Sequence, residues 1–220
     1  MTAFQQELLN TINDYCNLYH LCEDNCYENV VKQLEGRISS FSWACGATKL
    51  VLMFAEKNYV VKIPFFCKYD SEDEEECCAF CEAPMGADWN YCEAEALIYE
   101  AAARQGLGIC FAKTELLGYA NGYPIYIQPR AVILDDMDES DSVNNHSQEE
   151  IKKVKMQCSD ASCYCFNVNW LADCNNYFGE RIVNLLLQFI NDQGLEDFHN
   201  ANLGYLDGTP ILVDYSDYRE

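Results

Sequence analysis

The chain has 220 residues, half of them hydrophobic, and a formal net charge of -22 at pH 7. This length can bury one substantial core or two smaller ones. The charge disfavours binding to nucleic acids and to anionic membranes, because both repel an acidic protein. No segment reaches the roughly 18–20 apolar residues of a membrane span, and the N-terminus lacks the pattern of a secretory signal. We therefore expect a cytoplasmic protein.

Two acidic segments and a group of cysteines stand out from this composition. Residues 70–82 and 135–141 concentrate aspartate and glutamate, and we interpret both as solvated loops rather than sites for divalent cations. The chain has 14 cysteines, and because cytosolic thiols stay reduced, we expect free thiols. Cys78 and Cys81 form one C-x-x-C pair, but no second pair or nearby histidine completes a zinc site, so we expect no zinc.

The first half of the chain predicts helices, three strands and a further helix. Apolar residues at helical spacing predict a helical stretch over 3–35, interrupted before "YENVVKQLEGR". Three β-rich runs then predict antiparallel strands at 38–45, 48–54 and 59–65. An acidic insertion, 67–88, precedes the alanine- and glutamate-rich "DWNYCEAEALIYEAAARQGLG", which is typical of a helix closed by glycines.

The second half predicts two more strands, helices and a closing hairpin. The strands flank the turn "ANGY" in "AKTELLGYANGYPIYIQPRA". A weak helix is predicted at 147–157, whereas residues 158–172 show no clear pattern. One long apolar helix is predicted at 174–192, and "NLGYL-DGT-PILVD" predicts a short hairpin. The order β-β-β-α-β-β followed by helices indicates an α+β class.

A polar motif near the C-terminus follows these predicted strands and helices. The segment "DFHNANLGYLDGTPILVDYS" holds Asp197, Asn202 and, after an apolar run, Asp214. Behind a five-stranded lobe with one helix, this motif resembles the protein-kinase-like superfamily. It is most similar to the motif of aminoglycoside phosphotransferases and small-molecule kinases. The resemblance covers roughly residues 37–65, 90–131 and 174–217.

The resemblance implies a protein-kinase-like two-lobed fold. We expect an N-terminal helical segment at 1–36 and an N-lobe at 37–130, built on a five-stranded antiparallel sheet with one αC-like helix and carrying the insertion 67–88. A minimal helical C-lobe is expected at 131–220. Because the sequence stops at Glu220, we expect the later C-lobe helices to be absent, and a partner protein could complete or use the short lobe.

In this family a lysine on the third strand contacts the α- and β-phosphates of ATP and pairs with a glutamate of the helix. The resemblance assigns the lysine to Lys62 in "VVKIPF" and favours Glu95 as its partner, with Glu93 and Glu100 as alternatives. Glu93 lies roughly 200° around the helix from Glu95, so only one of them can face Lys62. A lysine among apolar neighbours also needs a partner, because an unpaired buried charge is costly.

The resemblance also suggests where the nucleotide binds. The hairpin "SWACGATKL" occupies the place of the glycine-rich loop, so Gly46, Ala47 and Thr48 are assigned to the phosphates, although only one glycine is kept. The stretch "YIQPRA" occupies the place of the hinge between the lobes, so Gln128 and Arg130 are assigned to the adenine edge.

The closing motif carries the expected chemistry. Asp197 occupies the catalytic-loop position, where a carboxylate orients the acceptor hydroxyl, and Asn202 and Asp214 are assigned to Mg²⁺. The predicted function is an ATP- and Mg²⁺-dependent phosphotransferase of unknown acceptor. A catalytically inactive pseudokinase that binds a partner through its acidic surface is the alternative, favoured by the lost glycines and the short C-lobe. A metal-binding adaptor built on the cysteine cluster is a third hypothesis.

Overall fold

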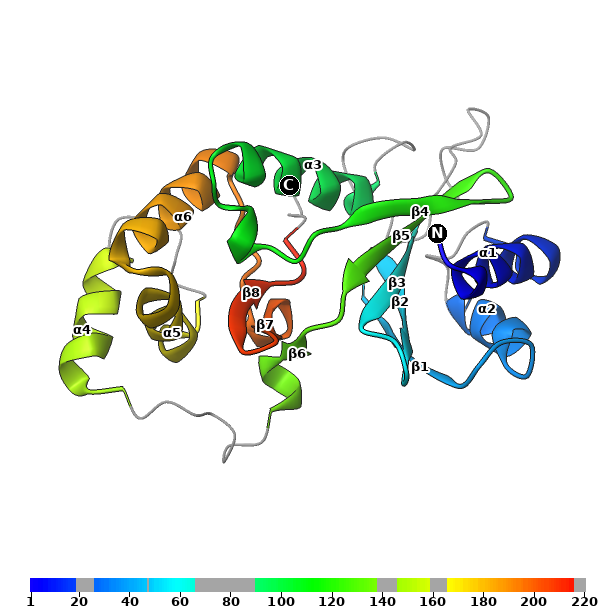
Figure 1. Cartoon of the computed structure of the whole chain (residues 1–220), viewed down its shortest axis with the longest axis horizontal. Helices are drawn as coiled ribbons and strands as arrows, with labels where there is room; N and C mark the ends of the chain where they lie inside the picture. The colour runs from blue at the N-terminus through cyan, green and yellow to red at the C-terminus, as the bar shows by residue number, and fades with distance from the viewer. Residues whose placement is uncertain (19–25, 47, 66–89, 138–145, 159–165, 216–220) are drawn as a thin grey trace, which may run out of the picture. The chain divides into compact units, whose positions relative to one another are not determined.

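The computed structural model describes residues 1–18, 26–46, 48–65, 90–137, 146–158 and 166–215. These residues form an α+β protein with a five-stranded antiparallel sheet and six α-helices (Figure 1). They divide into two compact units: unit 1 comprises Met1–Ala96 and Thr114–Arg130, and unit 2 comprises Leu97–Lys113 and Ala131–Asp217. None of the helices in these ranges is both long enough and apolar enough to span a membrane.

Several sequence predictions fall on parts of the chain outside the described residues. They are the insertion 67–88 with Cys78 and Cys81, the loop residue Ala47, and most of the acidic segment 135–141.

The sheet of unit 1 contains the five strands that the sequence predicts for the N-lobe. They are β1 (Phe41–Cys45), β2 (Lys49–Phe54), β3 (Tyr59–Pro64), β4 (Glu115–Ala120) and β5 (Tyr123–Pro129), in the order β1-β2-β3-β5-β4. The predicted turn between β4 and β5 is confirmed: Asn121 and Gly122 have φ of 52° and 81°. Positive φ at both positions matches the twist of a two-residue hairpin.

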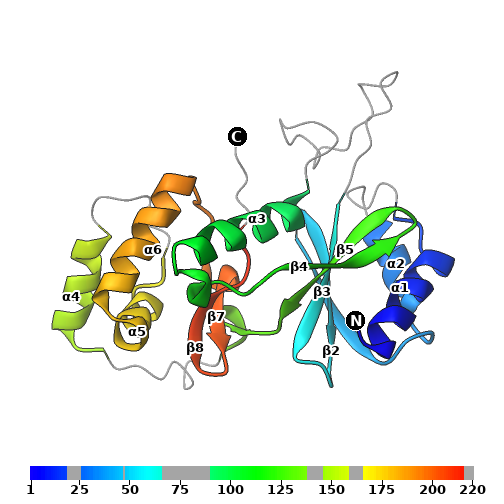
Figure 2. The same cartoon turned by 45° about the horizontal axis from the view of Figure 1, so that its top comes forward.

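Two N-terminal helices cover one face of this sheet, as Figure 2 shows. They are α1 (Ala3–Tyr15), which begins with a capping box between Thr2 and Gln5, and α2 (Cys26–Leu34). The Phe4 ring packs edge-on against Phe54 of β2, with ring centroids 5.0 Å apart. The two helices, which were predicted as a separate N-terminal segment at 1–36, therefore share one apolar core with the sheet.

Helix α3 (Tyr91–Arg104) begins at a side-chain cap that ties it to the sheet of unit 1. The Oδ1 atom of Asn90 accepts hydrogen bonds from the backbone N–H groups of Cys92 and Glu93, both at 3.1 Å. Its Nδ2 group donates to the hydroxyl of Tyr126 on β5 at 2.8 Å. Because an N-cap fixes where a helix starts, this contact also fixes which side chains of the first turn face the sheet.

Unit 2 packs three helices and a small sheet around an apolar core. Its elements are α4 (Gln148–Gln157), α5 (Val168–Phe178), α6 (Glu180–Gln193), β6 (Val132–Ile133), β7 (Leu203–Leu206) and β8 (Thr209–Leu212). Trp170 of α5 is buried, and its indole N–H donates to the carbonyl of Gly204 on β7 at 3.0 Å. The predicted hairpin is present, with Asp207 and Gly208 at φ of 51° and 80° in its turn.

The prediction of one long helix at 174–192 is wrong. The chain forms α5 and α6 instead, and they are separated at Gly179, whose φ is 84° and ψ 151°. Only glycine adopts this backbone conformation without strain, so the residue ends one helix and begins the next. The apolar periodicity on both sides of Gly179 suggests one helix, because a single glycine does not interrupt the spacing of its neighbours.

Strand β6 was not predicted from the sequence. It has only two residues, and it pairs with β7 through Val132 opposite Tyr205 and Ile133 opposite Gly204. A Cβ atom at Gly204 would clash with the carbonyl oxygen of Val132. This glycine therefore allows the close approach of the two strands.

Candidate functional site

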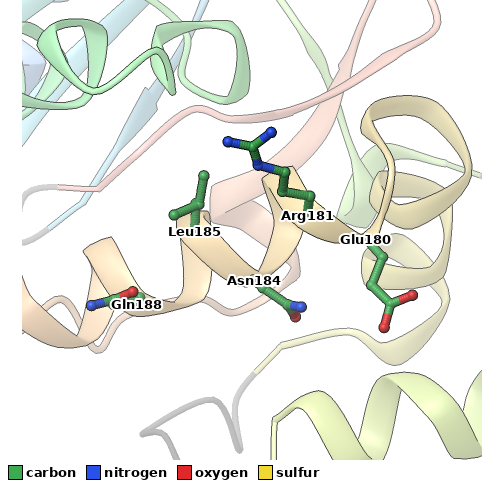
Figure 3. A pocket seen from close by; sticks show the side chains of 5 residues that line it. All are labelled: Glu180, Arg181, Asn184, Leu185 and Gln188. Atoms are coloured by element: carbon green, nitrogen blue, oxygen red, sulfur yellow. The ribbon is translucent and has the colours of Figure 1, made fainter.

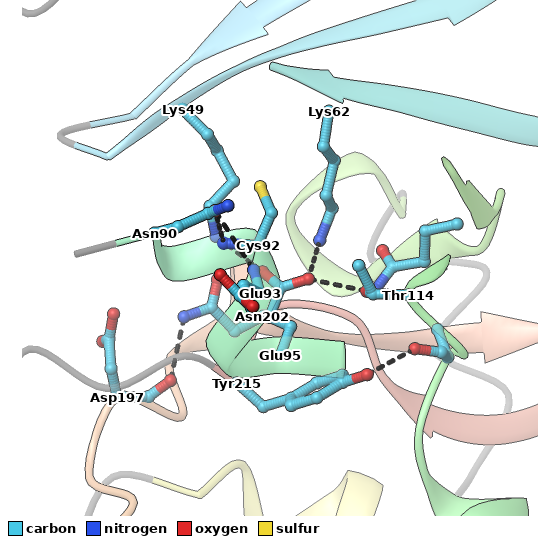
Figure 4. Close-up of polar contacts among 12 residues, drawn as sticks. Lys49, Lys62, Asn90, Cys92, Glu93, Glu95, Thr114, Asp197, Asn202 and Tyr215 are labelled. Carbon is cyan, nitrogen blue, oxygen red and sulfur yellow. Dashed lines mark hydrogen bonds and ion pairs between the residues drawn. The ribbon is translucent and has the colours of Figure 1, made fainter. Parts of the chain in front are cut away.

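The buried charges of unit 1 converge on one carboxylate, Glu95 of α3. The Nζ atom of Lys62 on β3 donates to Glu95 Oε2 at 2.7 Å, so the predicted ion pair is present. The Nζ atom of Lys49 on β2 donates to Glu95 Oε1 at 2.6 Å, a contact that was not predicted. All three side chains are almost fully buried. Figure 4 shows both lysines reaching from the strands toward this carboxylate.

Two neutral side chains hold the same carboxylate in place. The hydroxyl of Thr114 donates to Glu95 Oε2 at 2.7 Å, and the side-chain amide of Gln128 donates to the Thr114 hydroxyl at 2.9 Å. Gln128 is 2% exposed, so its side chain belongs to this internal network. Because Glu95 accepts hydrogen bonds from three donors, the position of its carboxylate is fixed.

The two alternative glutamates lie on the outer side of α3. Glu93 and Glu100 are exposed, as their position around the helix relative to Glu95 requires. Burial raises the pKa of the Tyr126 hydroxyl to about 12, and the nearby charge of Glu93 adds to this effect. Tyr126 therefore stays protonated at neutral pH and acts as the acceptor for the helix cap Asn90.

The hairpin that the resemblance assigns to the phosphates is closed by its own backbone. The N–H group of Gly46 donates to the carbonyl of Lys49 at 3.1 Å, and the carbonyl of Thr48 accepts from Phe65 N–H at 2.9 Å. Gly46 has no positive φ, and a Cβ atom there would meet nothing within 4 Å. The Gly46 amide is thus already used in the turn.

The residues assigned to the adenine edge are also engaged inside unit 1. The backbone N–H of Arg130 donates to the carbonyl of Asn58 at 2.9 Å. Its guanidinium donates to the carbonyl of Phe54 at 3.2 Å. These contacts attach the end of β5 to the turn between β2 and β3. A base at this position would therefore have to use backbone groups other than the Arg130 N–H.

In unit 2, the loop after α6 is organised by Asn202. Its Nδ2 group donates to the backbone carbonyl of Asp197 at 2.8 Å, and its own backbone N–H donates to His199 O at 2.9 Å. Asn202 is buried, whereas the Asp197 side chain is 58% exposed and lies 3.5 Å from His199 Nε2. The buried amide thus holds a turn that presents the Asp197 carboxylate to solvent.

The donor set around Asn202 fits a magnesium ion. The backbone N–H of Val213 donates to Asn202 O at 3.0 Å, which brings the next residue, Asp214, close to Asn202. Since Asn202 donates through Nδ2, its Oδ1 atom is the group suited to a cation. Mg²⁺ prefers oxygen ligands and retains several waters, so one carboxylate and one amide oxygen suffice. Over the described ranges, no three histidine, cysteine, aspartate or glutamate side chains cluster as a metal site.

The residue after Asp214 anchors this strand end. The hydroxyl of Tyr215 donates to the carbonyl of Ala112 at 2.7 Å, and its ring packs edge-on against Phe111 with centroids 5.0 Å apart. Tyr215 is buried. The anchor fixes the backbone that carries Asp214, and the sequence offers no signal for it because the two partners are about a hundred residues apart.

A second buried polar cluster in unit 2 was also missed. Asp173 of α5 contacts His146 Nε2 at 3.1 Å through one carboxylate oxygen and accepts the hydroxyl hydrogen of Tyr205 at the other. Burial, reinforced by the bond to Asp173, raises the pKa of Tyr205 far above its usual value. The cluster joins α5 to β7 and to the start of α4, and we assign it to the fold of this unit.

One open surface pocket lies on α6 (Figure 3). Its lining consists of Glu180, Arg181, Asn184, Leu185 and Gln188, all exposed and all from the same helix. Binding sites for small molecules bring polar groups together from several elements in an apolar setting. This pocket has neither feature, so the candidate sites are the cluster around Glu95 in unit 1 and, separately, the cluster around Asn202 in unit 2.

Each of the two clusters has its own chemistry within its own unit. The group around Glu95 joins two ammonium groups and one hydroxyl to a single buried carboxylate. The group around Asn202 presents an exposed carboxylate and oxygens suited to a hard cation. No protein-family model, curated protein or solved structure matches the chain.

Proposed function

We propose that the protein is an ATP- and Mg²⁺-dependent phosphotransferase with a protein-kinase-like two-lobed fold, in which unit 1 corresponds to the N-lobe and unit 2 to a short C-lobe. The observation that carries the proposal is the buried ion pair between Lys62 of β3 and Glu95 of α3, at 2.7 Å. A strand lysine held by a helix glutamate is the arrangement that positions an ammonium group on the α- and β-phosphates of ATP.

The remaining roles are distributed over the loop of unit 2. Asp197 orients the acceptor hydroxyl with its exposed carboxylate, while Asn202 and Asp214 hold Mg²⁺, which neutralises phosphate charge when bound. Asn202 has a second task, because its Nδ2 group binds the backbone of Asp197 and sets the direction of that carboxylate. Phosphoryl transfer depends mainly on positioning and charge stabilisation, so these few groups are sufficient.

A pseudokinase that binds nucleotide without turnover is the second candidate. It is favoured by the hairpin at Gly46, whose amide hydrogen is used within the turn and is not directed at a phosphate. The net charge of -22 would then serve the binding of a basic partner protein. Turnover separates the two candidates, since only the phosphotransferase consumes ATP.

Thermal unfolding of the purified protein with and without Mg²⁺-ATP tests the proposal. A ligand at about 100 times its Kd stabilises the folded state by roughly 2.7 kcal/mol. For a chain of this size the melting temperature rises by about 5–10 °C. ATP without a divalent cation and adenosine with Mg²⁺ are the controls, and both should give smaller shifts. If no purine nucleotide changes the melting temperature with Mg²⁺ or Mn²⁺, the proposal is wrong.

A further inference from the structure

We propose that His199 is a positioning residue, which holds the carboxylate of Asp197 in the direction in which it orients an acceptor hydroxyl. The role of Asp197 in the reaction rests on the proposed function. The contact between the two side chains is a feature of unit 2, where His199 Nε2 lies 3.5 Å from Asp197 Oδ1.

The backbone that carries both side chains is held by buried groups. Phe198, which lies between the two residues in the chain, is buried and stacks on Phe166 with ring centroids 4.4 Å apart. Asn202 donates from Nδ2 to the carbonyl of Asp197 at 2.8 Å (Figure 4) and from its backbone N–H to the carbonyl of His199 at 2.9 Å. The turn is therefore fixed, whereas the side chains of Asp197 and His199 are 58% and 57% exposed.

A backbone hydrogen bond decides which nitrogen of His199 carries the ring hydrogen. The N–H group of Ala201 donates to His199 Nδ1 at 3.2 Å. A neutral imidazole has one donor nitrogen and one acceptor nitrogen. Since Nδ1 is the acceptor, the hydrogen is on Nε2, and Nε2 is the nitrogen that lies next to the carboxylate of Asp197.

This arrangement makes His199 a group that orients Asp197, and not a base or a metal ligand. The lone pair of Nδ1 is used by the Ala201 N–H, and Nε2 carries a hydrogen, so neither nitrogen offers a lone pair to a proton or a cation. An N–H group next to a carboxylate restrains the rotation of an exposed side chain, which otherwise samples several rotamers. The contact is long at 3.5 Å, and hydrogen bonds of catalytic groups typically shorten in the substrate complex.

His199→Asn tests the inference, because it removes one of the two contacts of the ring and keeps the other. An asparagine oxygen accepts from the backbone N–H two residues further on, so the bond to Ala201 is kept, but no group replaces Nε2. With Mg²⁺-ATP as the substrate and water as the acceptor, kcat should fall about three- to tenfold, and KM for ATP should stay unchanged. The melting temperature should stay within about 2 °C of the wild type.

Two further variants show whether the Nε2–H group is responsible. His199→Gln keeps an N–H donor that reaches the carboxylate of Asp197, so it should recover part of the turnover. Glu196→Gln is the control, since Glu196 is the exposed residue directly before Asp197, and it should turn over ATP like the wild type. The inference is wrong if His199→Asn has the kcat of the wild type, or if His199→Gln is no faster than His199→Asn.

An NMR measurement that needs no turnover separates this inference from the proposed function. Three-bond couplings between the backbone and Asp197 Cγ give the populations of the χ1 rotamers. One rotamer should predominate in the wild type, and His199→Asn should average over several. This result in a protein that does not turn over ATP supports the positioning contact and refutes the phosphotransferase. Equal χ1 populations in the wild type and His199→Asn overturn the inference, whether or not ATP is consumed.

Discussion

Replacing Glu95 by alanine should destabilise unit 1 more than any other change of a single charge on α3. The substitution removes the carboxylate whose oxygens lie 2.6 Å from Lys49 Nζ and 2.7 Å from Lys62 Nζ. It also removes the acceptor of the Thr114 hydroxyl. Removing one partner of a buried ion pair costs about 3–5 kcal/mol. For a chain of this size that corresponds to a fall in melting temperature of roughly 6–20 °C.

The matched control is Glu93→Ala, on the same helix but exposed. A substitution at such a surface position usually changes stability by no more than about 0.5 kcal/mol. Hydrogen exchange gives the local measurement: in Glu95→Ala, protection should fall in β2 and β3, whereas α5 and α6 of unit 2 serve as an internal reference. If Glu95→Ala unfolds at the same temperature as Glu93→Ala, the group around Glu95 is not a stabilising ion pair and the reasoning fails.

Three further predictions concern the other parts of the molecule. Asp197→Asn should keep Mg²⁺-ATP binding and lose phosphoryl transfer, whereas ATP binding by Asp214→Ala should no longer depend on Mg²⁺. If Asp197→Asn and the wild type turn over ATP equally fast, the catalytic group lies elsewhere. Gly204→Ala should lower the free energy of unfolding by about 1–3 kcal/mol in urea, because its Cβ atom meets a backbone carbonyl, whereas Gly46→Ala, which meets nothing, should not. Burial raises the pKa of the Cys110 thiol from 9.0 to about 12. As the pH rises, the thiol therefore ionises in the unfolded protein before it ionises in the folded one. The free energy of unfolding should fall between pH 9 and 12, by at most about 1.4 kcal/mol per pH unit for this thiol. Cys110→Ala should reduce the slope of that loss in urea unfolding at increasing pH, and an unchanged slope would contradict the assignment.

The sequence by itself determined the elements whose signals are local. Alternating apolar residues and the turns at Asn121–Gly122 and Asp207–Gly208 determined the strands, since both act through neighbouring residues. Helical geometry determined that Glu93 and Glu95 cannot both face Lys62, because they lie roughly 200° apart around the helix, and it left Glu93 and Glu100 as alternatives to Glu95. The resemblance to kinases then paired Glu95 with Lys62, and that contact is present at 2.7 Å.

Only the tertiary structure decided which side chains of separate strands and helices contact one another. Lys49 reaches Glu95 because the register of β2 on β3 puts it on the inner face, and sequence spacing does not encode register. The register of β5 on β3 likewise puts Gln128 on the face of Lys62, where its amide joins the hydrogen bonds around Glu95. Gly179 divides the predicted long helix through a backbone conformation that periodicity cannot reveal. Asp173 finds partners 27 and 32 residues away, and such contacts form only when separate elements pack, because the hydrophobic core and not local propensity brings them together.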